Sequence, residues 1–279
     1  MPDNSQTNFH KLRHKLETHH KKVVEEFHRK HHTTIKKAKK HGLAIASTAI
    51  LASSILTATP PDLHSQKFSS AKSQEMARLN EFMLQLGKIL NQKDKLNPAE
   101  EQVVAEALSK KFDMNLKISI AGNRLNDVFG YIGAEQHLKR WNGDTLTNHD
   151  IQKAGMAPLQ GSFKDFDNAE QEKYYVAVQL HELPEWNEKW AELKPWYRYR
   201  KVFIYNPDNQ KGIVAVIGDS GPAMWTGKIF GGSPEVMDYL DRVDGAQKGK
   251  VVILLIDDPE NKIALGPANA IDTNLALKN

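Results

Sequence analysis

Residues 218–222, with the sequence Gly-Asp-Ser-Gly-Pro, place groups that could do chemistry at the end of an apolar run. The run at residues 213–217 (IVAVI) predicts a buried strand, and the glycine and proline predict a sharp turn after Asp219. A carboxyl beside an aromatic wall can be desolvated, which makes it a usable proton donor, and Trp225 follows closely in the chain. Asp219 is therefore a candidate general acid; the alternative is an Asp that only caps its own turn.

The same stretch contains Ser220, in a sequence similar to the Gly-Asp-Ser-Gly-Gly-Pro of trypsin-like proteases, where the serine is the nucleophile. Here the second glycine is missing, which would alter the backbone donors of the oxyanion hole. The segment that follows, residues 223–237, does not have the pattern of the strand expected in those proteases. We therefore do not expect a serine protease, and we keep Ser220 only as a candidate substrate contact.

The basic residues of the chain are concentrated at its start. Residues 1–41 contain 11 Lys and Arg against 4 Asp and Glu, together with eight of the 12 histidines. The remaining residues, 42–279 (the body of the chain), contain 27 Lys and Arg against 30 Asp and Glu. The body therefore lacks the excess of positive charge typical of nucleic-acid binding, and we expect no nucleic-acid partner. The start of the chain predicts a solvated cationic tail, although its histidines could bind metal. The absence of cysteine excludes a disulfide framework and a cysteine-ligated zinc site.

An uncharged segment of 16 residues, 43–58, follows this tail and ends before two prolines. As a helix it would span about 24 Å, which is short of the ~30 Å hydrocarbon core. A cationic block followed by an apolar block predicts a signal anchor at residues 42–58, with 1–41 in the cytoplasm and the body outside a bacterial cell membrane. If the signal is cleaved, the body is secreted. The alternative is a buried, alanine-rich helix.

A linker and helical spacer are expected over residues 59–115. Residues 59–73 are polar and predict the linker. Apolar residues then recur at steps of three and four between residues 76 and 90, which predicts an amphipathic helix. The sequence Asn-Pro-Ala-Glu at 97–100 predicts the start of a second helix, with an N-cap, a proline at the first position and a capping box. This pair could be a spacer, a partner-binding face or a cap packed on the next domain.

From residue 116 the chain contains several short β-rich runs and few long helices. Two of these runs flank a turn cluster, Asn-Pro-Asp-Asn at 206–209, and a short helix is expected from Ser233. Residues 129–155 predict a mixture of short helix and loop. The fold class that follows is mainly β with α: a small barrel with helical insertions over 116–268, followed by a C-terminal tail at 269–279. The predicted strands lie within residues 116–122, 174–183, 200–205, 212–218 and 249–258.

The order of these pieces resembles the double-psi β-barrel of the rare lipoprotein A family. That family has a strand that runs into an Asn-containing turn, then a strand that ends in Asp-Arg-Gly-Pro, then Gly-Arg, a serine and a helix. The barrels of membrane-bound lytic transglycosylase A and of expansins are more distant analogues. The resemblance covers roughly residues 201–256, a fifth of the chain. The corresponding residues here are Val202 to Asn209, Asp219 to Pro222, Gly227-Lys228 and Ser233.

The resemblance implies a module that acts on peptidoglycan or binds it. In the lytic members the Asp of this motif protonates the glycosidic oxygen, and the sugar's own 6-hydroxyl closes on the anomeric carbon, which gives an anhydro end without consuming water. That role falls on Asp219. The family's upstream histidine has a loose counterpart in His181, and its second Asp would fall at Gly231. The missing carboxylate disfavours a hydrolase that needs two carboxylates at this position.

Other polar and aromatic residues could complete the site. Glu135 could serve as a second acid or hydrogen-bonding group, and His137 and Lys228 as polar contacts to substrate. The Trp225 indole could stack on a sugar ring. We expect no cofactor and no metal: a zinc site built from His137, His149 and His181 lacks the close spacing typical of such sites.

The sequence thus predicts a bacterial envelope protein held by one N-terminal membrane helix. Its extracytoplasmic barrel would cleave peptidoglycan glycan strands as a lytic transglycosylase. The alternative is a non-catalytic barrel that binds the wall. The catalytic candidates are Asp219, His181 and Glu135, and the substrate-binding candidates are Trp225, Lys228, Ser220 and His137.

Overall fold

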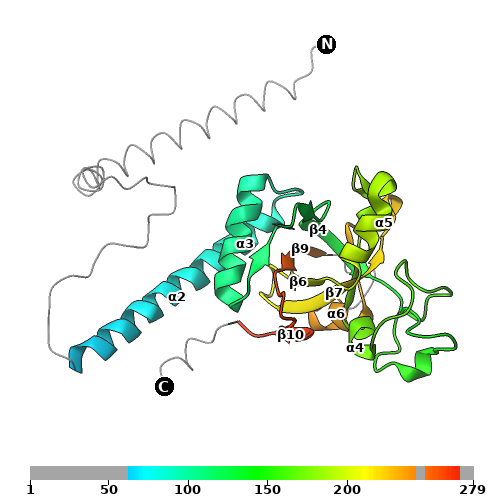
Figure 1. The fold of residues 1–279 in the computed structure, drawn as a ribbon. Helices are drawn as coiled ribbons and strands as arrows, with labels where there is room; N and C mark the ends of the chain where they lie inside the picture. The colour runs from blue at the N-terminus through cyan, green and yellow to red at the C-terminus, as the bar shows by residue number, and fades with distance from the viewer. Residues whose placement is uncertain (1–61, 243–248, 271–279) are drawn as a thin grey trace, which may run out of the picture. The chain divides into compact units, whose positions relative to one another are not determined.

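The computed structural model describes residues 62–242 and 249–270, and their side chains from residue 74 onward. These residues belong to one compact unit that begins at Pro61 (Figure 1). The predicted cationic tail (1–41) and the predicted anchor (42–58) lie outside the described residues, as does the C-terminal tail beyond residue 270. Within the described ranges, none of the helices combines the length and the apolar character that crossing a bilayer requires.

The described chain is a mixture of short strands and helices, with two longer helices at its start. The helices are α2 (Asp62–Asn91), α3 (Pro98–Phe112), α4 (Ala169–Lys173), α5 (Trp186–Tyr197) and α6 (Pro234–Tyr239), with short 3-10 turns at Leu146–Asn148, Leu180–Glu182 and Met224–Thr226. The strands are β1 (Leu116–Lys117), β2 (Ser119–Ile120), β3 (Asn123–Arg124), β4 (Phe129–Ala134), β5 (Tyr175–Val178), β6 (Lys201–Tyr205), β7 (Gly212–Ser220), β8 (Phe230–Gly232), β9 (Gly249–Ile256) and β10 (Gly266–Ala268).

Six of the strands form a closed, mixed β-barrel. Around the ring, β4 pairs with β9, β9 with β6 and β6 with β7, all antiparallel. The ring then continues from β7 to β5 (parallel), from β5 to β8 (antiparallel) and from β8 back to β4 (parallel). Strands β1 and β10 extend the sheet at β9 and β7, and β2 and β3 form a separate antiparallel pair. Closure leaves no unpaired edge within the ring.

The order of strands in the barrel has an internal two-fold relation. If β4 is exchanged with β7, β5 with β8 and β6 with β9, every pair of neighbours in the ring is preserved. The exchange also maps one parallel pairing, β4 with β8, onto the other, β7 with β5. The barrel is therefore built from two topologically equivalent three-strand halves.

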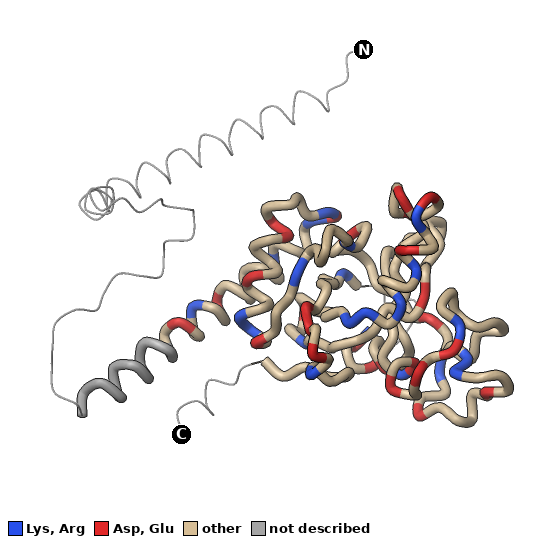
Figure 2. The backbone as a smooth tube through the Cα atoms, viewed as in Figure 1, with Lys and Arg blue, Asp and Glu red and all other residues tan. Residues whose placement is uncertain are grey.

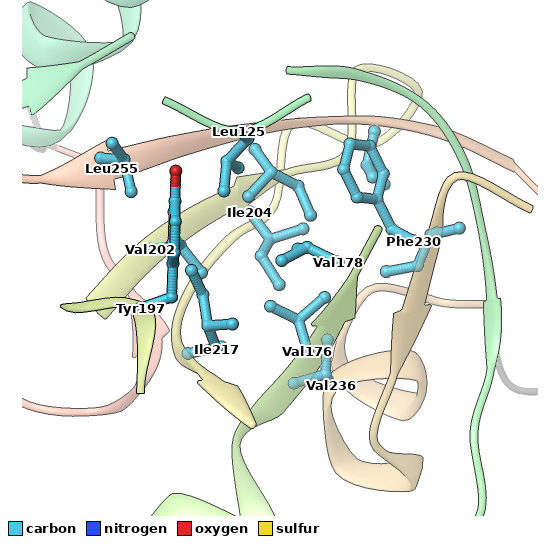
Figure 3. Close-up of a cluster of buried hydrophobic side chains, with 14 of the residues drawn as sticks. Leu125, Val176, Val178, Tyr197, Val202, Ile204, Ile217, Phe230, Val236 and Leu255 are labelled. Atoms are coloured by element: carbon cyan, nitrogen blue, oxygen red, sulfur yellow. The ribbon is translucent and has the colours of Figure 1, made fainter. Parts of the chain in front are cut away.

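Alternate residues of the ring strands fill the barrel interior, as expected for strands whose side chains alternate between two faces. Figure 3 shows several of these side chains pointing toward one another from different strands. Helix α5 adds Tyr197, whose hydroxyl donates a hydrogen bond of 2.6 Å to the Arg124 carbonyl, and α6 adds Val236. The residues labelled in that view are Leu125, Val176, Val178, Tyr197, Val202, Ile204, Ile217, Phe230, Val236 and Leu255.

The helical pair packs on the outer face of the barrel and shares a second hydrophobic cluster with it. Met83 and Leu90 of α2 and Phe112 of α3 are buried there with apolar side chains of β6, β7 and β9. The Phe112 and Phe203 rings lie 4.6 Å apart between their centroids. Of the three alternatives left open by the sequence, the structure therefore bears out a cap packed on the barrel.

Two expectations about local structure were wrong. The stretch 129–155 was expected to mix short helix and loop, but its first six residues form β4 of the barrel. Its two glycines hide the strand pattern, and they are required because a Cβ on Gly130 or Gly133 would meet the side chains of Ile229 and Lys228 at under 3 Å. The predicted linker is also helical from Asp62, the residue after the second proline, because no glycine or proline interrupts residues 62–86.

The start of α3 matches its sequence signals and gives a first prediction. The Asn97 side chain accepts hydrogen bonds from the backbone N–H groups of Ala99 and Glu100, and the Glu100 side chain accepts one from the N–H of Asn97. Asn97→Ala should lower the free energy of unfolding by about 1 kcal/mol, because it leaves helix N–H groups without a partner. Urea unfolding of the variant against wild type measures this. An unchanged midpoint would mean that the cap does not contribute to stability.

Candidate functional site

Asp219 lies at an irregular point of the sheet near the end of β7. The pairing of β5 with β7 shifts register between Val176 and Ala177, so that Ala177 pairs with Asp219 and Gly218 is the extra residue. Such a bulge redirects the side chain that follows it. The Asp219 Oδ1 atom accepts hydrogen bonds from the backbone N–H of Ser162 (2.7 Å) and of Ser220 (2.8 Å). In the described part of the chain, hydrogen bonds reach only this one oxygen of the carboxyl, which leaves Oδ2 available.

A row of small residues crosses the outer face of the barrel next to Asp219. Gly133 of β4 pairs with Gly231 of β8, Gly231 with Ala177 of β5, and Ala177 with Asp219. Two residues with long side chains, Glu135 and Lys228, lie over the two glycines of this row, and a hydrogen bond of 2.9 Å joins Lys228 Nζ to Glu135 Oε1. The row therefore carries an ion pair at one end and the Asp219 carboxyl at the other.

Glu135 occupies the space in which a side chain at Gly231 would lie. A Cβ built on Gly231 would lie 2.2 Å from Glu135 Oε1. The position where the rare lipoprotein A pattern has its second Asp thus has a carboxylate above it, contributed by the residue that directly follows β4. Because neighbouring strands are about 4.8 Å apart, the backbones of Gly231 and Asp219 are separated by roughly 10 Å. The structure places the catalytic candidates Asp219 and Glu135 along one row of the sheet.

Tyr175 is a fully buried residue at the start of β5, close to both of these carboxylates. Burial raises the pKa of its hydroxyl well above the usual value, and the negative charges of Glu135 and Asp219 raise the pKa further. The hydroxyl donates a hydrogen bond to the Gln136 carbonyl. Tyr175 therefore stays neutral, and it ties the start of the β4–β5 connection to the strand that carries Ala177.

The structure also brings His181 next to Ser220. His181 Nδ1 lies 3.4 Å from Ser220 Oγ, and His181 Nε2 lies 3.2 Å from Glu182 Oε1. Gln179, two residues earlier, donates hydrogen bonds from Nε2 to the Pro222 and Lys228 carbonyls, which holds the loop after β7 in place. His181 is partly exposed, so a bound ligand could reach it.

Trp225 does not form the aromatic wall beside Asp219 that was expected from the sequence. Its side chain is 90 % exposed, so it packs against little in this structure. The backbone around residues 161 and 162 covers the Asp219 carboxyl instead, and a Cβ on Gly161 would lie 3.5 Å from the carboxyl carbon. The indole is placed on the 3-10 turn Met224–Thr226, where it could stack on a ligand from outside.

His137 is not part of this surface. It is fully buried and belongs to a separate cluster with His149 and Glu172. The three histidines considered for a zinc site are thus divided, because His181 lies beside Ser220. A ligand that contacts the small-residue row could not touch the His137 ring directly, which makes this residue unsuitable as a substrate contact.

Several residues of the site could not have been found from the sequence. Ser162 donates its backbone N–H to Asp219, and any residue except proline could do the same, so it has no sequence signal. Gln179 also lacks a signal, since its partners are two backbone carbonyls more than 40 residues away in the chain. Glu172 is separated from His137 by 35 residues, far more than the short spacings of common zinc motifs.

Acidic and basic residues are interspersed over the described chain, as Figure 2 shows, and no face in that view is dominated by one sign of charge. Lys228 is paired with Glu135, and Arg140 with Asp144.

No family model matches the chain, and no curated protein matches it.

Proposed function

We propose that this barrel cleaves the glycan strand of peptidoglycan by a lytic transglycosylase-like reaction, with Asp219 as general acid. The observation that carries the proposal is the geometry of Asp219. Two backbone N–H groups fix its Oδ1, and no hydrogen bond from the described residues reaches its Oδ2, which lies at the end of the small-residue row. A carboxyl held by one oxygen can carry a proton on the other and present it to a bound sugar.

We further propose that the barrel is a double-psi β-barrel related to that of rare lipoprotein A. The closed ring of six strands supports this, as does the two-fold relation that maps one parallel pairing of the ring onto the other. The Asn206 turn between β6 and β7, and Ser233 as the N-cap of α6, also support it. These agreements lie in the same 56 residues on which the sequence resemblance was based, Lys201 to Ile256.

The reaction that the proposal assigns to Asp219 needs only one carboxyl group. In this reaction a protonated Asp219 gives its proton to the glycosidic oxygen as the bond to the anomeric carbon breaks. The 6-hydroxyl of the same sugar then bonds to that carbon, and its proton returns to the Asp219 carboxylate. No water is consumed, and the acid is regenerated. A second carboxylate some two strands away is therefore not required for bond cleavage.

The other site residues would hold the glycan. Glu135 and Lys228 offer an acceptor and a donor close together on the barrel surface. His181 and Ser220 lie next to the acid and could bind hydroxyl or acetamido groups. The exposed Trp225 indole supplies an apolar face for a sugar ring.

A non-catalytic, wall-binding barrel is the second candidate, and one observation favours it. The exposed side chains of Met224 and Trp225 lie on the turn after Asp219, an arrangement that suits sugar binding without any reaction. In that case the Asp219 carboxyl would only accept hydrogen bonds from sugar hydroxyl groups.

Incubation of the purified full chain with isolated sacculi separates these two functions. Transglycosylase activity should release soluble muropeptides with anhydro ends, which mass spectrometry identifies. Co-sedimentation with sacculi without any soluble product would instead support the binding module. If the chain neither releases a soluble product nor co-sediments with sacculi, both proposals are contradicted.

The location of the protein is also a proposal: we propose that the barrel faces the cell wall, outside the cytoplasmic membrane. The cationic and apolar blocks of residues 1–58 support it. Protease added to spheroplasts should digest the barrel while a cytoplasmic control protein survives. A barrel that resists until the membrane is lysed would contradict this location.

Gly231→Ala gives a prediction for the role of Glu135. The added methyl group would occupy the position of the Glu135 carboxylate, which ends a flexible side chain and can move away. We expect the barrel to stay folded, the ion pair with Lys228 to be lost, and the release of muropeptides to fall about tenfold, equivalent to about 1.4 kcal/mol in the transition state. Initial rates on sacculi measure the effect.

Glu135→Gln is the matched variant, since it removes the charge without adding volume at Gly231. Both variants should lower the rate to a similar extent, whereas Glu106→Gln, an exposed change on α3, should leave it unchanged. Wild-type rates in both site variants would mean that the ion pair does not contact the substrate.

A further inference from the structure

The connection between β4 and β5 contains a buried cluster that the proposed reaction does not use. His137, Glu172 and His149 are 0 %, 1 % and 6 % exposed, and one ligand atom from each lies within 4.8 Å of the others. His137 Nδ1 lies 3.0 Å from Glu172 Oε1, and His149 Nδ1 lies 3.1 Å from Glu172 Oε2. One carboxylate is thus placed between two imidazole nitrogens.

The other nitrogen of each ring already faces a hydrogen-bond acceptor. His137 Nε2 donates to the Ile151 carbonyl, which can only accept. His149 Nε2 lies 3.2 Å from Asp144 Oδ2, and Arg140 holds that carboxylate through two further hydrogen bonds of 2.8 and 3.0 Å. Each Nε2 therefore carries a proton. When the two rings are neutral, both Nδ1 atoms present lone pairs toward the Glu172 oxygens.

A lone pair that faces a carboxylate oxygen at about 3 Å is repelled by it, so each such contact requires a positive charge between the nitrogen and the oxygen. Two extra protons would supply it, but they would create two imidazolium rings whose centroids are 4.2 Å apart in a buried site. Like charges at that separation repel strongly away from water. One divalent cation in place of both protons gives the same total charge and bonds to all three residues.

We propose that His137, His149 and Glu172 form a binding site for a divalent transition-metal ion of the zinc type. Two imidazole nitrogens and one carboxylate are ligands that such ions prefer. Ligands about 2.1 Å from a tetrahedral ion lie roughly 3.4 Å from one another. The separations of 3.0 and 3.1 Å between the nitrogen and oxygen atoms need to expand only slightly. Hydrogen bonds from the outer ring nitrogens to a carbonyl and a carboxylate are the usual support of histidine ligands.

A second buried group favours a cation at this place. Glu235, on α6, is 7 % exposed, and among the described residues its Oε2 atom has no hydrogen-bond partner. Glu235 lies close enough to His137 and Glu172 to interact electrostatically with both. A divalent ion nearby would compensate this carboxylate as well as Glu172.

The burial of all three ligands assigns the ion a structural role. Catalytic zinc sites also use three protein ligands, with water or substrate in the fourth position, but all three ligands here lie away from the solvent. The ion would join the first part of a long connection (His137), its middle (His149) and helix α4 (Glu172). The same connection carries Glu135 and Ser162, so the ion would hold the segment that shapes the candidate active surface.

The test compares metal retention between the full chain and variants of it, because the eight histidines of residues 1–41 could also bind metal. Wild type, Glu172→Gln and His149→Gln are loaded with Zn²⁺, dialysed against a weak chelator and analysed for metal by mass spectrometry. His181→Gln, which removes a histidine outside the cluster, is the matched control. Wild type and the control should retain about one ion more per chain than the two cluster variants.

Thermal unfolding gives a second readout that does not depend on the variants. Removal of metal with EDTA should lower the midpoint of wild type by about 5 °C or more, and Zn²⁺ should restore it. Equal metal retention in all four proteins, together with a wild-type midpoint that does not respond to EDTA, would overturn the proposal. If the cluster variants fail to fold, the response of wild type to EDTA and Zn²⁺ decides alone.

Discussion

Asp219→Asn should reduce the release of anhydro muropeptides from sacculi by about 100-fold or more, because an amide cannot donate the proton that the leaving oxygen needs. Asparagine keeps the shape of the side chain, and its amide oxygen can still accept the hydrogen bonds from the N–H groups of Ser162 and Ser220. The thermal midpoint should therefore stay close to that of wild type. Initial rates measured by mass spectrometry of the soluble products test this prediction.

Two further variants make that result specific. Asp238→Asn is the same chemical change at an exposed position of α6, and it should leave the rate unchanged. Ser220→Ala removes the hydroxyl 3.4 Å from His181; it should lower the rate less than tenfold, with products that still carry anhydro ends. If Ser220→Ala were inactive while Asp219→Asn stayed active, the result would instead identify Ser220 as a nucleophile. His181 would then be its base, and Glu182 would orient that histidine.

Phe203→Ala should lower the free energy of unfolding by about 3–5 kcal/mol, the largest effect on stability that we expect from a single substitution here. The Phe203 side chain is 0 % exposed and lies between Phe112 of α3 and Gly212 of β7, where a Cβ on that glycine would be 2.4 Å from the Phe203 ring. Truncation would leave a cavity between the helical pair and the barrel. Urea unfolding monitored by fluorescence measures the change.

Phe82→Ala provides the comparison, because this α2 residue is 41 % exposed. Its loss should cost less than about 1 kcal/mol. A similar small effect for Phe203→Ala would mean that the helices are not fixed to the barrel through this contact. A separate, earlier unfolding step in wild type would contradict the shared core in the same way.

The sequence predicted those parts of the fold that depend on local patterns. The hairpin of β6 and β7, the apolar strand β9 and the caps at Asn97 and Ser233 were all expected from runs and turn residues that lie close together in the chain. Strand β4 was missed, because its glycines are explained only by the Ile229 and Lys228 side chains that pack over them. That contact joins residues nearly 100 positions apart.

The candidate site, like the fold, was predictable only where it depends on residues that lie close together in the sequence. Asp219 could be proposed from the sequence because the strand, the turn and the acid are contiguous. The position of Glu135 above Gly231 could not be found, because it depends on the register of β4 against β8. The burial of His137 likewise depends on partners 12 to 35 residues away, so a polar residue between apolar ones was wrongly taken as a surface contact.

The identity of the sugar end formed by the purified full chain tests the central claim most directly. Sacculi digested in water enriched with heavy oxygen should yield anhydro ends that contain none of the label, because the 6-hydroxyl supplies the oxygen that closes on the anomeric carbon. The same digestion with Asp219→Asn should yield almost no product. Labelled reducing ends from the wild-type chain would show hydrolysis by water and would contradict the reaction proposed for Asp219.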